Sequence, residues 1–133
     1  MNKICCVEDD SAILTALQYT LSQEGYEVMT AMTKTQGLEL IQQESFDLVL
    51  LDGSGYEICK RMREDSRLKE IPVIFLTACD DEVNIVMGLD LGADDYITKP
   101  FRVRELISRM NSVLRRAGKK QAETTINYQD LSI

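Results

Sequence analysis

Short apolar runs alternate with amphipathic helical patterns along this chain of 133 residues. Runs of successive apolar residues are typical of strands that are buried on both faces, as in a parallel sheet covered by helices. They predict strands over residues 3–7, 27–30, 46–52, 72–77 and 95–98. The pattern therefore indicates one central sheet of five strands.

The segments between these strands have apolar residues at helical spacing. The first carries Ile13, Leu17 and Leu21 on one side, and we expect Ser11 as its N-cap and Gly25 as its C′ residue. Further helices are predicted around 38–41 and 58–62, from 81 to 91, and from 103 to 114. This alternation predicts right-handed βαβ crossovers and a single α/β domain, a doubly wound, five-stranded parallel sheet with helices on both faces.

Polar residues stand at the ends of four of these strands. In chain order they are Glu8, Asp9 and Asp10, then Asp52, Thr77 and Lys99. Because the carboxyl ends of parallel strands line one edge of an open sheet, where ligands bind, we expect these side chains to converge. Carboxylates, a hydroxyl and an ammonium at one place suggest phosphate chemistry on an acidic site that holds a metal ion.

The acidic groups at this edge need a counter-charge. Carboxylates that meet at one place repel one another, and their ionisation is suppressed unless a cation is present. Mg²⁺ is the hard divalent ion that suits oxygen ligands and phosphate. Asp52 in particular gains nothing from burial after an apolar run, so it needs a partner.

The other polar residues also have ordinary structural interpretations. The acidic run after the first strand could serve only as favourable charge at a helix N-terminus. Thr77 could cap the next helix, and Lys99 could be a surface residue. Pro100 after Lys99 permits a cis peptide bond that fixes a tight turn, and a lysine ammonium suits phosphate oxygens. The combination is therefore more specific than any one member.

The composition limits the class of protein. A formal net charge of −7 argues against a nucleic-acid surface here, because such surfaces neutralise phosphates with Lys and Arg. No stretch approaches the roughly 18 apolar residues of a membrane span, and acids follow too early for a signal peptide. We expect a cytoplasmic protein with no membrane contact. Its cysteines, Cys5, Cys6, Cys59 and Cys79, lack metal spacing and should be buried reduced thiols.

The character of the chain changes after Arg116. Residues 118–125 are polar and predict a linker, whereas 126–133 (INYQDLSI) alternate like an opening strand that has no partner in this chain. We therefore expect one domain over residues 1–117 and the start of a truncated second domain at 126.

Four motifs carry a resemblance to a known family. They are VEDD after the first strand, FDLVLLD in the third, PVIFLTA in the fourth and GADDYITKPF around the fifth. Over about residues 1–117 they resemble the receiver domain of two-component response regulators, which implies a flavodoxin-like fold. GADDYITKPF and the ending VLRR are most similar to the transcriptional regulators that have a C-terminal winged-helix DNA-binding domain. Residues 126–133 are similar to the first strand of that effector domain.

The resemblance implies roles for the site residues. Asp52 would accept a phosphoryl group from a phosphohistidine on a sensor histidine kinase. Asp9 and Asp52 would bind Mg²⁺ directly, with Glu8 acting through water. Thr77 would hydrogen-bond the acyl phosphate, and Lys99 would pair with another of its oxygens. These roles match phosphoryl transfer in general, which depends mainly on positioning and charge neutralisation.

The stretch after Asp52 departs from the family. The loop before the third helix is shorter here by about five residues, because Gly53-Ser54-Gly55-Tyr56 follows at once, although a strand–helix loop this short is feasible. The backbone carbonyl two residues past the Asp usually binds the metal, and Ser54 holds that position. Either the loop is truly short, or residues of it are missing from the sequence. A true deletion leaves the fold and the nucleophile plausible and puts the metal affinity in doubt.

The resemblance also implies how the signal leaves the domain. Tyr96 would turn inward as Thr77 moves, and the face of the fourth helix, fifth strand and fifth helix would form a homodimer. That face holds Val86, Leu89, Asp90, Asp94, Asp95, Glu105, Arg109 and Arg116. Its mixed charges would pair across a two-fold axis, although Ile85 stands where a basic partner for Glu105 is usual. DNA would be bound only through the missing effector domain.

Three other functions compete with this interpretation. The first is a degenerate receiver that works only as a phosphorylation-independent dimerisation or docking module, which the short loop supports. A flavodoxin-like cofactor binder would need a Gly/Ser/Thr-rich loop where this chain has three acids. An Asp-nucleophile phosphatase would place an Asp-x-Asp pattern on the first strand, which Glu8-Asp9-Asp10 fits poorly.

Overall fold

The computed structural model describes residues 2–53, 55–78 and 92–126, with the backbone alone at residue 78 and from 119 to 126. The strands are β1 (Lys3–Val7), β2 (Glu27–Ala31), β3 (Leu48–Asp52), β4 (Val73–Ala78) and β5 (Asp95–Lys99). The helices are α1 (Ser11–Gln23), α2 (Lys34–Gln43), α3 (Tyr56–Glu64) and α5 (Val103–Ile126). The helix predicted over 81–91 lies outside the described residues.

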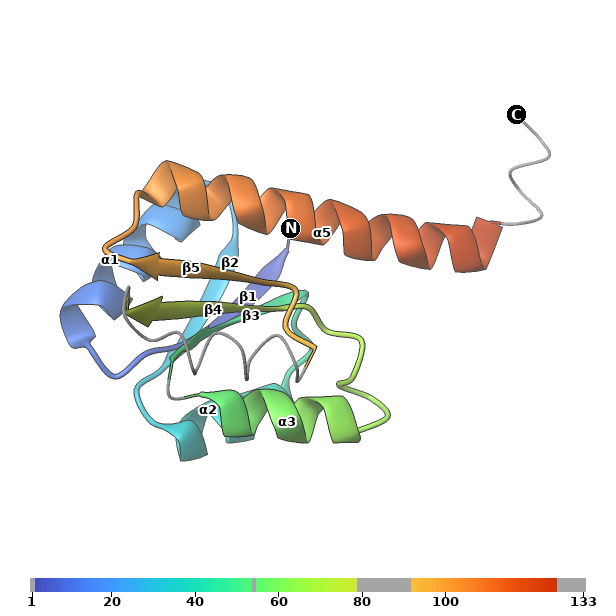
Figure 1. The fold of residues 1–133 in the computed structure, drawn as a ribbon, viewed down its shortest axis with the longest axis horizontal. Helices are drawn as coiled ribbons and strands as arrows, with labels where there is room; N and C mark the ends of the chain where they lie inside the picture. Colours follow the sequence, from blue (N-terminus) through green and yellow to red (C-terminus); the bar gives the residue numbers. More distant parts are fainter. Residues whose placement is uncertain (1, 54, 79–91, 127–133) are drawn as a thin grey trace.

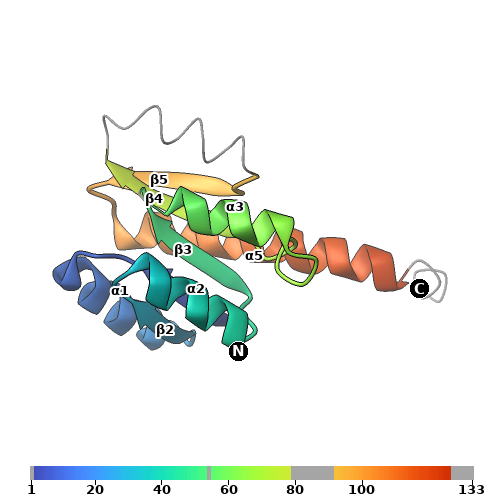
Figure 2. The ribbon, with the colours of Figure 1, turned by 90° about the horizontal axis from the view of Figure 1, so that it is seen from below.

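The strands form one parallel sheet in the order β2-β1-β3-β4-β5. Helices α1 and α5 cover one face of the sheet, and α2 and α3 cover the other (Figures 1 and 2). The predicted doubly wound fold is confirmed, and every strand lies within two residues of its predicted bounds. The strand order reverses between β1 and β3, so a crevice for a ligand is expected at the carboxyl ends of these two strands.

The sheet separates two hydrophobic cores. Because neighbouring side chains on a strand point to opposite faces, Cys6 enters the core under α1 and α5, whereas Cys5 enters the core under α2 and α3, with Cys59. These three thiols are buried and form no disulfide. Burial raises the pKa of Cys5 to about 12 and also raises the pKa values of Cys6 and Cys59. The prediction of buried reduced thiols is confirmed for them, and Cys79 lies outside the described residues.

The start of α1 differs from the sequence prediction. Asp10, and not Ser11, is the N-cap residue: its backbone is extended, and its carboxylate accepts hydrogen bonds from the backbone N–H groups of Ala12 and Ile13. A carboxylate is favoured there because it also meets the positive end of the helix dipole. The other end agrees with prediction, since Gly25 follows the C-cap with φ +93°.

Helix α5 runs well past the sheet, as Figure 1 shows. It continues through the predicted linker at 118–125, which is helical because that stretch is rich in good helix formers and has one glycine. The predicted boundaries of the two domains stay a prediction, because residues 127–133 lie outside the described part. None of the helices in the described ranges is both long and apolar enough to cross a membrane.

Candidate functional site

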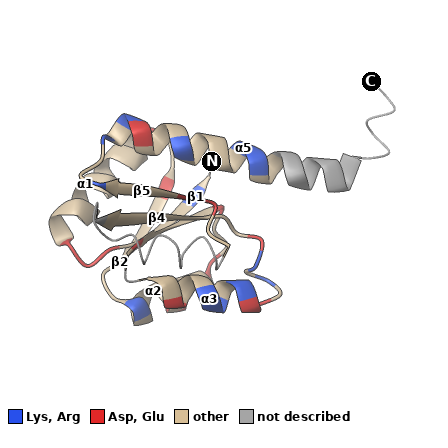
Figure 3. Cartoon of the chain, viewed as in Figure 1, with Lys and Arg blue, Asp and Glu red and all other residues tan. Residues whose placement is uncertain are grey.

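The carboxyl ends of β1 and β3 lie side by side, because the strands pair in parallel with Val7 opposite Leu51. Glu8 and Asp9 follow β1 on the acidic loop coloured red beside α1 in Figure 3, and Asp52 ends β3. One carboxylate oxygen from each of these three acids lies within 4.8 Å of the others. The Asp9 N–H also donates to Asp52 Oδ2 at 3.4 Å. The predicted convergence is confirmed for these three acids, whereas Asp10 caps α1, and the donor set fits one hard divalent cation.

Lys99 reaches this site from the edge strand of the sheet. Two strands separate β5 from β1, yet Lys99 Nζ lies 2.6 Å from Glu8 Oε1. Glu8 is 1% exposed, and this burial raises the pKa of its carboxyl, although the contact with Lys99 and a hydrogen bond from the Asp10 N–H oppose the rise. The Lys99–Pro100 peptide bond is cis, as the sequence allows. The ion pair itself was not predicted, because no local pattern shows that these two side chains meet.

Thr77 contributes a buried hydroxyl next to the acids. It lies one residue beyond the level at which Asp52 pairs with Leu76, and it is 2% exposed. Within the described part of the chain, no group forms a hydrogen bond with Thr77 Oγ1. A buried hydroxyl without a partner costs about 1–3 kcal/mol, so this position favours a ligand with acceptor oxygens. The competing role as a helix cap concerns residues 79–91, which are not described.

A tight turn connects β3 to α3 directly. The Gly55 N–H donates to the carbonyl oxygen of Asp52 at 2.9 Å, and α3 starts at the next residue, Tyr56. A Cβ on Gly55 would lie 3.1 Å from Leu51 Cβ and 3.3 Å from the Asp52 oxygen, so a residue without a side chain suits this turn. The strand that carries Asp52 is thus hydrogen-bonded directly to the residue before α3. Ser54, the predicted carbonyl ligand, lies outside the described residues.

The sequence matches a known family over most of its length. Residues 4–111 match the response regulator receiver domain. The chain belongs to the receiver domain family. Receiver domains act with histidine kinases in two-component signalling and bind Mg²⁺ at an acidic site, and this receiver domain has such an acidic cluster. The resemblance drawn from the four sequence motifs is thereby confirmed.

This receiver domain is similar to several known proteins, one compared by sequence and two by solved structure. The transcriptional regulatory protein AfsQ1 of Streptomyces coelicolor is 38% identical, and the match covers all of this chain and 60% of AfsQ1. The chain thus spans about 60% of the length of this curated relative. A CheY-like receiver domain protein of Methanospirillum hungatei is 33% identical with a TM-score of 0.85, over 90% of this chain and 98% of that one. The receiver domain of a Pseudomonas aeruginosa sensor histidine kinase, with a magnesium ion coordinated in its active-site cleft, is 25% identical with a TM-score of 0.78. That match covers 85% of this chain and 97% of the other.

The alignment with AfsQ1 bears on the short loop of this receiver domain. It spans 138 positions, five more than this chain has residues, so at least five residues of the relative have no counterpart here. This difference has the size of the shortening predicted after Asp52.

The predicted switch and dimer residues that the structure describes lie on or next to β5 and on α5. Tyr96 is half-buried on β5 opposite Phe75 and packs against the core under α2 and α3. Arg109 Nη1 binds both carboxylate oxygens of Asp95, at 2.9 and 3.1 Å, and Arg109 Nε lies 3.7 Å from Glu105. Three predicted dimer residues, Val86, Leu89 and Asp90, lie outside the described residues, and Arg116 is exposed on α5. The roles of these residues as a switch and a dimer face stay predictions.

Asp94 differs from the other residues of the predicted dimer face. Its carboxylate accepts a hydrogen bond from the Val73 N–H at 2.9 Å and lies 3.4 Å from Arg63 Nη2. These bonds tie Asp94 to its own sheet. Of the predicted dimer face, the described part of the chain also contains Asp95, Glu105, Arg109 and Arg116.

Proposed function

We propose that this receiver domain accepts a phosphoryl group on Asp52 from the phosphohistidine of a sensor histidine kinase. The observation that carries the proposal is the buried Thr77 hydroxyl, which has no described partner and lies one residue beyond the level of Asp52. Lys99 and the acidic cluster add the charges that a phosphoryl group and a divalent cation require. If Thr77 were only a helix cap and Lys99 only a surface residue, neither would need to lie beside the acidic cluster at the carboxyl edge of the sheet.

The transfer follows from the side chains in place. A carboxylate oxygen of Asp52 attacks phosphorus, the P–N bond of the phosphohistidine breaks, and its electron pair returns to the imidazole nitrogen. The Thr77 hydroxyl donates to one oxygen of the phosphoryl group, and the Lys99 ammonium neutralises another. Both groups act mainly by positioning and charge, which is what phosphoryl transfer requires of a protein.

Mg²⁺ is the proposed cofactor. Asp9 and Asp52 would hold it directly, whereas Glu8, already paired with Lys99, would contact it through water. When bound, Mg²⁺ supplies positive charge that lets the anionic carboxylate and the anionic phosphoryl group approach each other. The carbonyl of Ser54 would complete the set if the short loop presents it.

We propose that the phosphorylated domain controls a C-terminal DNA-binding domain through dimerisation. The relative AfsQ1 is a transcriptional regulatory protein, and this chain spans only part of its length. Asp95 and Arg109 lie on β5 and α5 and could exchange their internal ion pair for one across a two-fold axis. Exposed ion pairs contribute only about 0–1 kcal/mol each, so the dimer should be weak without phosphate.

The decisive experiment is phosphorylation by a small-molecule donor. With acetyl phosphate and Mg²⁺, intact mass spectrometry should show one added phosphate on the parent chain and none on Asp52→Asn. Asp47→Asn is the matched control, because Asp47 lies just before β3 at the opposite end of that strand. Equal labelling of Asp52→Asn would contradict the assignment. A parent chain that folds, dimerises and takes no phosphate would instead favour a phosphorylation-independent docking module.

A further inference from the structure

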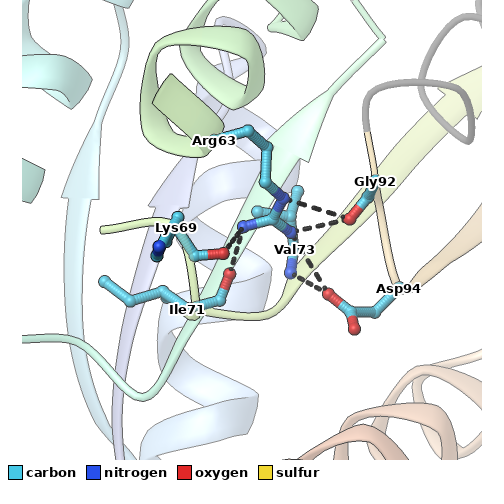
Figure 4. Close-up of polar contacts among 6 residues, drawn as sticks. All are labelled: Arg63, Lys69, Ile71, Val73, Gly92 and Asp94. Atoms are coloured by element: carbon cyan, nitrogen blue, oxygen red, sulfur yellow. Dashed lines mark hydrogen bonds and ion pairs between the residues drawn. The ribbon is translucent and has the colours of Figure 1, made fainter. Parts of the chain in front are cut away.

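Arg63, in the last turn of α3, binds two separate stretches of backbone at the end of the sheet opposite Asp52 (Figure 4). Its Nη1 donates to the carbonyl oxygens of Lys69, at 3.0 Å, and Ile71, at 2.8 Å. Its Nε and Nη2 both donate to the carbonyl oxygen of Gly92, at 3.2 and 2.8 Å. One guanidinium therefore joins the loop that leads into β4 to the turn that leads into β5.

The two backbone stretches are also paired with each other beside this arginine. The Val73 N–H donates to Asp94 Oδ2 at 2.9 Å, and the Asp94 N–H donates to the Val73 carbonyl oxygen at 2.8 Å. Arg63 Nη2 lies 3.4 Å from the same Asp94 oxygen. The starts of β4 and β5 are thus held together by a closed set of bonds with Arg63 at its centre.

The turn before β5 is shaped around the arginine. Gly92 has a φ of +87°, and a Cβ there would lie 3.2 Å from Arg63 Nε. Only a planar guanidinium with five N–H donors in a fixed fork can serve carbonyls on both sides at once. A lysine has one compact ammonium and could not reach both stretches together.

The strands fixed at this end carry phosphate-binding groups at the other. Thr77 on β4 pairs in register with Thr98 on β5, and Lys99 ends β5. The proposed metal ligands Glu8, Asp9 and Asp52 instead belong to β1 and β3. Anything that shifts β5 along β4 therefore moves Lys99 relative to Thr77, whereas the strands that carry Asp9 and Asp52 are not joined by Arg63.

We propose that Arg63 is a positioning residue for phosphoryl transfer. By joining the starts of β4 and β5, it sets the distance between Thr77 and Lys99 and so the fit of the phosphoryl oxygens between them. This inference rests on the proposed function of Asp52. It predicts a specific kinetic signature, in which loss of Arg63 slows transfer at saturating Mg²⁺ and leaves the Mg²⁺ requirement unchanged.

The test compares Arg63→Gln and Arg63→Lys with Arg67→Gln. Arg67 is a matched control, because its Nη2 also binds backbone carbonyls, those of Ile41 at 3.3 Å and Gln42 at 2.7 Å. Its bonds support the end of α2 and do not touch β4 or β5. Each variant is assayed for phosphorylation rate by acetyl phosphate at several Mg²⁺ concentrations, below its unfolding temperature.

Both Arg63 variants should be phosphorylated about tenfold more slowly at saturating Mg²⁺, the loss typical of removing a group that orients reacting side chains. The Mg²⁺ concentration for half-maximal rate should stay at the parent value, and Arg67→Gln should keep the parent rate. The inference would be overturned if the folded Arg63 variants were phosphorylated at the parent rate, or if Arg67→Gln were slowed equally. If Arg63→Gln fails to fold, the same rate measurements on Arg63→Lys and Asp94→Asn test the inference in its place. Asp94→Asn keeps an acceptor for the Val73 N–H. Failure of the parent chain to take phosphate would count against the proposed function and not against Arg63 alone.

Discussion

Lys99 Nζ and Glu8 Oε1 lie 2.6 Å apart although the two residues are 91 positions apart in sequence. The pair crosses the carboxyl edge of the sheet, since β3 and β4 lie between the strands that carry these residues. Glu8 is almost fully buried, whereas the Lys99 side chain is about a quarter exposed. The ammonium is thus held in the site in the unphosphorylated chain, and a phosphoryl group on Asp52 would compete with Glu8 for it.

Replacing Lys99 by Met should lower the free energy of unfolding by about 1–3 kcal/mol at neutral pH, because Glu8 stays buried without its cation. Burial already raises the pKa of Glu8, and loss of Lys99 should raise it further. A raised folded pKa means that the folded chain binds the proton more tightly than the unfolded chain, so stability falls as the pH rises through that range. The decrease in the free energy of unfolding should therefore vanish in acid, where Glu8 is protonated in both the parent chain and Lys99→Met.

Urea unfolding from pH 4 to 8 in EDTA measures this effect. Lys60→Met is the control, because Lys60 is exposed on α3. The same loss in both variants, or a loss in Lys99→Met that is equal at all pH values, would contradict the role of the ion pair.

Substituting Asp9 by Asn should raise the Mg²⁺ concentration for half-maximal phosphorylation by roughly tenfold, because it removes a metal ligand and leaves the nucleophile. Asp10→Asn is the matched control: it is the neighbouring carboxylate, it serves as the N-cap of α1, and an asparagine caps a helix equally well. The measurement is the Mg²⁺ dependence of labelling by acetyl phosphate. Equal changes in both variants would show that general acidity of the loop, and not a ligand set, binds the ion.

Substituting Arg109 by Glu should weaken the phosphorylated dimer about tenfold or more, because it places like charges opposite Asp95 across the proposed two-fold axis. Sedimentation of the phosphorylated chains measures the dissociation constant. Arg104→Glu makes the same charge change at an exposed position of α5 and should have a smaller effect. Unchanged dimerisation of Arg109→Glu would place the interface on another face.

Two glycine substitutions should change stability in opposite directions. A Cβ on Gly37 of α2 would lie 2.7 Å from Val7 Cγ2 on β1, so Gly37→Ala should cost about 1–3 kcal/mol through overpacking. A Cβ on Gly118 of α5 would meet no atom of the described residues within 4 Å, so Gly118→Ala should stabilise the helix by up to about 1 kcal/mol. Thermal unfolding of both variants checks the signs. Stabilisation by Gly37→Ala would mean that α2 does not pack this closely on β1.

Sequence patterns predicted most of the fold because its central strands, β1, β3 and β4, are buried on both faces. Residues 48–51 are an apolar run, and five strand-like runs separated by helical spacing admit few topologies. Choices between neighbouring residues at the end of a helix were harder to predict. Asp10 and Ser11 are both good N-cap residues, and only the backbone conformation at Asp10 decided between them. The polar stretch at 118–125, predicted as a linker, is helical, because its helix propensity continues α5.

By itself, the sequence determined the parallel sheet, the place of the polar residues at its carboxyl edge and the membership of the receiver domain family, because these depend on local patterning and motif order. Only the tertiary structure decided which of these groups touch. It paired Lys99 with Glu8, left the Thr77 hydroxyl without a partner among the described residues, and gave Arg63 its place between β4 and β5. Such contacts join residues far apart in the chain, and their distances follow from strand order and register, which no local pattern encodes.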